Sequence, residues 1–177
     1  APQITLMAGV AVAELFSGYC PGGVTIKWPN DVLLKGRKVC GILTEMKAAA
    51  GSLDFIILGM GLNINMNPDD FDPTLRETAT SLKIETGRVH ERLEMISRLL
   101  ALIEKWYKIF LYAGFPGLRE TWLRYADILG RRITVAYKDE FQAGVVTGIA
   151  EDGAILMQDK DGAGRRVIAG DVLLSER

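Results

Sequence analysis

Apolar residues near the N-terminus recur at the spacing of one helix face. They are Leu6, Met7, Val10, Ala13 and Leu15. Because positions three and four apart lie on the same side of a helix, this spacing predicts a helix over Gln3–Ser17. Pro2 is tolerated in a first helical turn, and Gly18 can end the helix.

Short apolar runs separated by turn-forming residues follow this helix. They predict strands at Val24–Lys27, Val32–Leu34, Val39–Met46 and Leu53–Met60. Lys35-Gly36-Arg37, between the second and third strands, is typical of a hairpin loop. The last run is apolar on both faces after Asp54, which predicts a strand buried between two layers.

The clearest helical pattern covers Arg92–Tyr112, and its apolar stripe is expected to face the core. The stripe consists of Leu93, Ile96, Leu99, Leu100, Ile103, Trp106 and Phe110. Gly114 and Pro116 end this helix, and a short helix is predicted over Leu118–Ala126. A weaker pattern predicts another short helix near Thr74–Leu82.

The pattern changes from Arg131 onward. Short strands are predicted at Arg132–Tyr137, Phe141–Ala150, Ala154–Gln158 and Arg165–Ile168, with Gly- and Asp-rich turns between them. Regular short strands of this kind indicate a small barrel, and its core alone is marginal in size. We therefore expect this part to lean on the rest of the chain.

Composition excludes several classes of function. The 177 residues include 21 Lys and Arg against 22 Asp and Glu, and this balance argues against a nucleic-acid partner. The longest apolar runs are too short for a membrane span. Cys20 and Cys40 are too few for a disulfide framework, so we expect buried thiols and a reducing, cytoplasmic location. The chain starts at Ala1 rather than Met, so we expect a fragment or a processed product.

Charged residues are concentrated in the segment from Lys27 to Gly41, around one predicted hairpin. They are Lys27, Asp31, Lys35, Arg37 and Lys38, with Asn30 beside them. Hairpins commonly carry exposed charges, so a solvated edge is one interpretation. The order favours a site instead, because Lys suits phosphate oxygens and Asp31 could hold Mg²⁺ together with substrate phosphates. Gly41 within a strand could let a ligand approach the backbone.

A second candidate ligand contact follows the strand at 53–60. Asn63 comes after Gly59 and Gly61, where the backbone can be approached closely. The segment is neither a dinucleotide fingerprint nor a P-loop, so a buried strand end is the alternative interpretation.

Three motifs together resemble the biotin protein ligase (biotin–[acetyl-CoA-carboxylase] ligase) family. They are K-W-P-N-D-V, then R-K-V-C-G-I-L-x-E, then G-x-G-x-N-I-N, and the resemblance covers nearly the whole chain. It implies an α/β fold: a mixed β-sheet covered by helices, similar to class II aminoacyl-tRNA synthetases. Residues 1–128 would be an N-terminally truncated catalytic domain, and residues 129–177 a small SH3-like β-barrel.

The resemblance also implies an activity. Family members use ATP and Mg²⁺ to convert biotin to biotinyl-5′-AMP, then transfer biotin to a lysine of a carrier, such as the biotin carboxyl carrier protein of acetyl-CoA carboxylase. By matching positions, Lys38 resembles the lysine at the biotin carboxylate and bridging phosphate, and Lys27 a second phosphate-side lysine. Asp31 resembles the carboxylate placed for the metal or the acceptor amine.

The remaining matches concern the adenylate. Asn30 and Asn63 resemble adenylate-side contacts, and Gly41 and Gly61 would give the ligand room. A Gly/Arg-rich loop and a biotin-binding segment precede the matching region in the family. Since Ala1 falls after both, we expect weak or no ligation by this chain alone.

Two other hypotheses stay open. The chain could be a non-catalytic module for dimerisation or carrier docking, and a homodimer is possible in either case. A lipoate ligase relative would share the broad fold, but the KWPND and RK-x-x-G motifs argue against it. His90, the only histidine, is expected at the surface or at a helix cap, and the acidic loop at Asp69–Asp72 is expected to be solvated.

Overall fold

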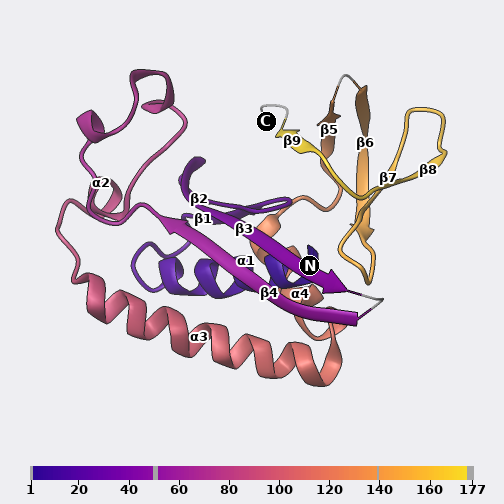
Figure 1. The fold of residues 1–177 in the computed structure, drawn as a ribbon. Coiled ribbons are helices and arrows are strands. Elements are labelled where there is room, and N and C mark those ends of the chain that lie inside the picture. Colours follow the sequence, from indigo (N-terminus) through magenta and orange to yellow (C-terminus); the bar gives the residue numbers. More distant parts are fainter. Residues whose placement is uncertain (1, 50–51, 139, 175–177) are drawn as a thin grey trace.

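The computed structural model describes residues 2–49, 52–138 and 140–174 (Figure 1). Its first half consists of α1 (Pro2–Ser17), β1 (Val24–Lys27), β2 (Asp31–Leu34), β3 (Arg37–Ala49) and β4 (Ser52–Leu62). The predicted first helix and all four predicted strands are therefore confirmed. The third and fourth strands each extend beyond the predicted bounds at both ends.

The first four strands form one sheet in the order β1-β2-β3-β4, and every neighbouring pair is antiparallel. The expectation of a mixed sheet is thus wrong for the strands described. Short connections join β1 to β2 and β2 to β3, and strands joined in this way run in opposite directions. The only parallel link among the described residues is an isolated bridge between Lys38 and Ala79.

Helix α1 lies between this sheet and two further helices, α3 (Arg92–Ala113) and α4 (Pro116–Ala126). The side chains of α1 are apolar and buried on nearly all sides of the helix, as expected for a helix enclosed between two layers. Below α1, α3 crosses the molecule as a long outer helix (Figure 1). None of the helices in the described ranges combines the length and apolar character that a membrane span requires.

The predicted core stripe of α3 is only partly buried. Of its residues, Leu99 and Trp106 are buried, whereas Leu93 is 81% exposed and Ile96 and Leu100 are also exposed. Met95, which was not in the predicted stripe, is buried. The helix contacts α1 and α4 along one narrow strip. Helical periodicity shows which residues share a face but not how much of that face a neighbour covers, and so the prediction overstated the core.

β4 shows the same difference from expectation. It is not buried between two layers, because the side chains of Phe55 and Ile57 are 48% and 54% exposed. The alternate residues Leu58 and Met60 are packed against the core. The helices cover one face of the sheet (Figure 1), and the side chains of Leu43, Phe55 and Ile57 on the opposite face of β3 and β4 are exposed.

A long connection joins β4 to α3 and contains only short helical turns. They are 3-10 turns at Pro68–Asp70 and Pro73–Leu75, followed by α2 (Leu82–Thr86). The helix expected near Thr74–Leu82 is wrong. Ser81 has an extended backbone and its hydroxyl accepts a hydrogen bond from the Ile84 amide, so it caps α2.

His90 lies in this connection and is buried, contrary to the expected surface position. Its Nε2 lies 2.7 Å from Thr86 Oγ1, and its backbone N–H donates to Asn65 Oδ1. Burial, followed by the positive charge of Arg88, lowers the pKa of His90. These contacts make it a structural residue that joins α2 to the end of β4.

The C-terminal part forms a second antiparallel sheet in the order β8-β7-β6-β5-β9. Its strands are β5 (Arg132–Tyr137), β6 (Glu140–Ile149), β7 (Ile155–Gln158), β8 (Gly164–Val167) and β9 (Asp171–Leu174). The four predicted strands are confirmed, and β9 was missed. Among the described residues, no pairing joins β8 to β9, so the sheet is open rather than a closed barrel.

The C-terminal sheet contacts the first half of the chain through the turn before β7. The indole Nε1 of Trp28 donates to the Gly153 carbonyl oxygen over 3.0 Å, and this contact is buried. Gly153 has a φ of 91°, and an added Cβ would lie 2.6 Å from Leu6 Cδ1 on α1. The turn can therefore approach α1 only because residue 153 has no side chain.

We expect Gly153→Ala to lower the free energy of unfolding by about 3 kcal/mol, because left-handed strain and overpacking add. Denaturant unfolding measures the loss. The matched control is Gly130→Ala, which has a φ of 74° but no atom within 4 Å of the added Cβ. Strain alone should cost that control about 1 kcal/mol. Equal losses in the two variants would contradict the packing argument.

Candidate active site

Four of the predicted site residues form one row across the first sheet. Lys27 on β1 is paired with Asp31 on β2, Asp31 with Gly41 on β3, and Gly41 with Gly61 on β4. Directly opposed residues in an antiparallel sheet point to the same face. The row therefore places an ammonium group and a carboxylate beside two positions that carry no side chain.

A β-bulge brings Lys38 to this face. Val32 is paired with Cys40, but Leu33 is paired with Lys38, so Val39 is an extra residue in β3. Side chains alternate along a strand, and one inserted residue reverses the alternation beyond it. Without the bulge, Lys38 and Gly41 would lie on opposite faces. Val39 is fully buried on the helix side, and its carbonyl oxygen accepts a hydrogen bond from the Asn63 amide.

The two opposite charges meet above Gly41. Lys38 Nζ lies 2.7 Å from Asp31 Oδ1. An added Cβ at Gly41 would lie 3.2 Å from Lys38 Cε and 3.3 Å from its Nζ, closer than ordinary contact. The lysine side chain thus lies across the glycine and uses the space that its missing side chain leaves.

This part of the sheet forms the floor of a cleft of about 740 Å³. Of the seven predicted site residues, Lys27, Asp31, Lys38, Gly41, Gly61 and Asn63 line it. Its other walls include apolar side chains, from Met66, Phe71 and Leu75 in the β4–α2 connection and from Leu173 on β9, together with Glu77 and Thr78. The cleft therefore combines charged groups on the sheet with apolar side chains from the connection.

Asn30 lies outside this cleft. Its side-chain amide donates to the Ile42 carbonyl oxygen over 3.0 Å, and its backbone carbonyl oxygen accepts from the Ile42 backbone amide. It lines a smaller cavity of about 320 Å³ between α1, Trp28 and the turn at Gly153. The structure thus separates Asn30 from the other six residues.

The apolar wall was missed by sequence reasoning. Phe71 stands in the acidic loop that was expected to be solvated; its acidic neighbours Asp69, Asp70 and Asp72 are exposed, but Phe71 itself is buried. An aromatic residue between acidic residues was the one available signal. The position of the loop over the sheet depends on contacts between segments far apart in the sequence.

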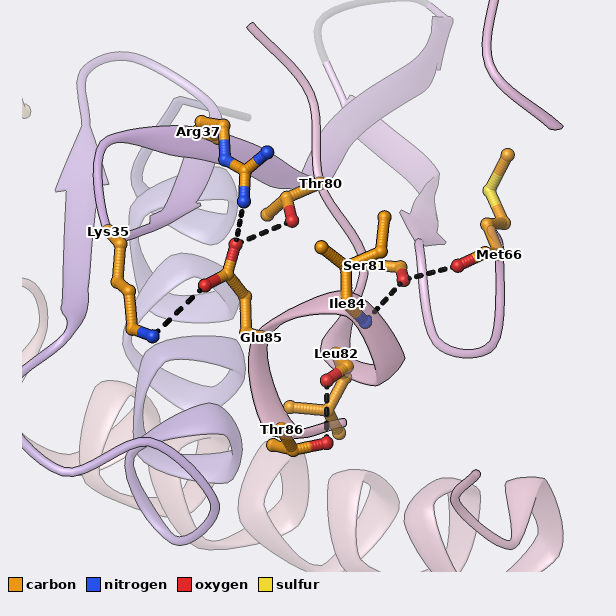
Figure 2. A network of polar contacts seen from close by, with 9 residues as sticks. All are labelled: Lys35, Arg37, Met66, Thr80, Ser81, Leu82, Ile84, Glu85 and Thr86. Atoms are coloured by element: carbon orange, nitrogen blue, oxygen red, sulfur yellow. Dashed lines mark hydrogen bonds and ion pairs between the residues drawn. The ribbon is translucent and has the colours of Figure 1, made fainter. Parts of the chain in front are cut away.

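Glu85 was also missed. Its carboxylate accepts hydrogen bonds from Arg37 Nη2 and Thr80 Oγ1, both at 2.6 Å, and lies 3.3 Å from Lys35 Nζ (Figure 2). Burial acts to raise the pKa of Glu85, but the hydrogen bonds from Thr80, Lys35 and Arg37 together outweigh it and lower the pKa. The group is therefore a buried carboxylate ion at neutral pH.

Comparison with known proteins identifies the class. The family model described as "Biotin/lipoate A/B protein ligase family" matches residues 4–63, and that described as "Biotin protein ligase C terminal domain" matches residues 128–175. The biotin–[acetyl-CoA-carboxylase] ligase of Paracoccus denitrificans is 31% identical over 173 residues, which cover 95% of this chain and 70% of that protein. The chain belongs to the biotin protein ligase family, so the resemblance is confirmed.

Other relatives agree on family and fold. The bifunctional ligase/repressor BirA of Bacillus subtilis (strain 168) is 34% identical over 173 residues, or 98% of this chain. The chain spans about half, 53%, of that protein's length. The structure of the biotin protein ligase from Aquifex aeolicus in complex with biotin and ATP superposes with a TM-score of 0.82 at 24% identity, covering 100% of this chain and 72% of that one.

The buried thiol beneath the cleft generates a prediction. Burial, reinforced by Asp31 and opposed by Lys38, raises the pKa of Cys40 to about 12. Since the thiolate is the nucleophile, we expect an aromatic disulfide reagent at pH 8 to modify the half-buried Cys20 much faster than Cys40 in the folded protein. Unfolding should make the two rates similar.

A Cys20→Ser control should leave only the slow thiol. Similar rates for the two thiols before unfolding would show that Cys40 is not held as a buried neutral group.

Proposed function

We propose that this chain carries the nucleotide and phosphate side of a biotin protein ligase site. The proposed reaction joins biotin to ATP as biotinyl-5′-AMP and transfers biotin to a lysine of a carrier protein, such as the biotin carboxyl carrier protein of acetyl-CoA carboxylase. One observation carries the proposal: Lys38 and Lys27 flank Asp31 beside Gly41 and Gly61 in one cleft. The biotin and ATP of the A. aeolicus complex support the same ligands.

The first proposed step brings two anions together. A carboxylate oxygen of biotin forms a bond to the α-phosphorus of ATP, and the bond to the pyrophosphate leaving group breaks. Lys38 and Lys27 would reduce the repulsion and stabilise the charge that develops on the α-phosphate. In the second step the carrier amine forms a bond to the biotinyl carbonyl carbon, AMP leaves, and Asp31 is placed to accept the amine proton.

The site fits a Mg²⁺ ion bound partly by substrate. Asp31 Oδ1 is buried and is paired with the Lys38 ammonium at 2.7 Å, a cation that substrate phosphates could draw away when Mg²⁺ binds. No group of three or more potential metal ligands is found among the described residues. Mg²⁺ commonly takes one or two carboxylates together with substrate phosphates, so Asp31 would hold it, and the ion would neutralise phosphate charge.

The apolar side chains of the cleft fit the adenine base. Met66, Phe71 and Leu75 line it, and Asn63 lines the same cleft as a candidate adenylate contact. Gly61 leaves room for the ligand above the sheet, whereas the space over Gly41 holds the Lys38 side chain that would contact the ligand. The adenylate contact of Asn30 remains a prediction, because this residue faces a separate cavity.

Further parts of the proposal concern organisation. We propose a division near residues 128 and 129, supported by the family model that starts at 128, and an SH3-like relationship for the five-stranded sheet. The two free cysteines support a reducing, cytoplasmic location. A homodimer stays a prediction.

The nucleotide site can be tested with a lysine pair on one strand. We expect Lys38→Ala to weaken Mg²⁺–ATP binding by about tenfold or more, because a charge-assisted contact to phosphate is lost. Lys47→Ala, an exposed lysine on the same strand β3, should stay within about twofold of the unmodified chain. Titration calorimetry measures both affinities.

The same titration distinguishes the proposed ligase site from the alternative, a non-catalytic module for dimerisation or carrier docking. That module should bind a carrier domain or a second copy of the chain but no ATP. Equal ATP affinities in the two lysine variants would contradict a role for Lys38 at the phosphates.

The glycine floor gives a second test. We expect Gly41→Ala to weaken ATP binding by about fivefold to tenfold, since the new methyl group would displace the Lys38 ammonium. Gly59→Ala is the matched control, because its nearest contact would be an ordinary one, 3.6 Å from the Leu43 carbonyl oxygen. A larger loss of ATP affinity in the Gly59 variant would contradict the argument.

A further inference from the structure

Glu85 is a buried carboxylate that the proposed chemistry does not use. Its side chain is 3% exposed, whereas its partners Lys35 and Arg37 are 61% and 36% exposed. Burial of a carboxylate is costly unless several donors satisfy it. The three donors come from two separate segments: Lys35 and Arg37 from the β2–β3 hairpin, and Thr80 from the connection before α2 (Figure 2).

Lys38 follows Arg37 in β3, and its backbone is bonded to the segment that contains Thr80. The Lys38 amide donates to the Thr78 carbonyl oxygen over 2.7 Å, and the Lys38 carbonyl oxygen accepts from the Thr80 amide over 2.9 Å. Beyond β4, whose last residue Leu62 is paired with Cys40, residues 78–80 thus continue the sheet beside β3. Thr80 is one residue of this short pairing, and its hydroxyl donates to Glu85.

The opposite end of the connection is fixed independently of Glu85. Ser81 Oγ donates to the Met66 carbonyl oxygen, and the first amides of α2, of Leu82 and Lys83, donate to the carbonyl oxygens of Asn63 and Ile64. These bonds anchor α2 to the end of β4. Glu85, by contrast, connects α2 and Thr80 to Lys35 and Arg37 of the hairpin.

We propose that Glu85 is a positioning residue that holds Lys38 and the Thr78–Thr80 segment in register at the nucleotide cleft. The assignment of Lys38 to the phosphates rests on the proposed function above. Glu85 lies behind the cleft and does not line it, so it acts through the hairpin and not on the ligand.

Amide hydrogen exchange followed by NMR tests this placement without any ligand. We expect Glu85→Ala to speed exchange of the Lys38 and Thr80 amides by about tenfold or more, while amides of β5 and β6 change by less than about twofold. Glu85→Gln keeps an acceptor for Arg37 and Thr80, so it should restore much of the protection. Glu94→Ala removes an exposed glutamate of α3 and should leave both amides unchanged.

ATP titration of the same variants tests whether the position of Lys38 affects nucleotide binding. Glu85→Ala should weaken ATP binding by about fivefold or more, and Glu85→Gln by less. Should the alanine variant not fold, the glutamine variant against the Glu94 control decides. Faster exchange at Lys38 in a chain that binds no ATP at all would support the positioning while refuting the proposed function. Unchanged exchange in a folded Glu85 variant, or unchanged ATP affinity alongside faster exchange, would overturn the proposal.

Discussion

The arrangement of the site depends on one extra residue in β3. Because Val39 is inserted opposite the β2 pair Val32 and Leu33, the side-chain alternation reverses between Gly41 and Lys38. The reversal gives Lys38 the cleft face and leaves Val39 in the core. A regular strand of the same sequence would direct the ammonium group toward α1, into an apolar layer where a charge is strongly disfavoured. The bulge therefore satisfies the core and the site at the same time.

Two glycines provide the open surface over which the Lys38 side chain lies. Lys38 can reach Asp31 only across a residue without a side chain, and the Gly41–Gly61 pair extends that open surface to β4. Charged groups held close together repel or attract strongly only where their geometry is fixed and water is limited. A sheet supplies such fixed geometry, because Asp31 and Gly41 lie on the central strands β2 and β3, each held between two neighbouring strands.

Local signals were sufficient for most of the fold. Alternating apolar runs and turn residues predicted α1, the strands β1 to β4 and the hairpin at Lys35-Gly36-Arg37. The candidate residues came from the family motifs, and six of the seven line one cleft. What failed depends on long-range contact. The bulge at Val39, the burial of His90 and Phe71, and the uncovered sides of α3 and β4 are decided by which segment packs where, and a periodic pattern carries no such information.

Glu85 shows why the supporting residues of a site are the hardest to predict. In the sequence it is one acidic residue in a short polar helix, and no spacing connects it to Lys35 or Arg37, which lie about fifty positions earlier. Its significance appears only when the connection after β4 folds back beside β3 and pairs with Lys38. A lysine that must present its ammonium group at a fixed point needs its backbone held as well as its side chain directed. The carboxylate that ties the two flanking segments together supplies that second constraint from behind the cleft.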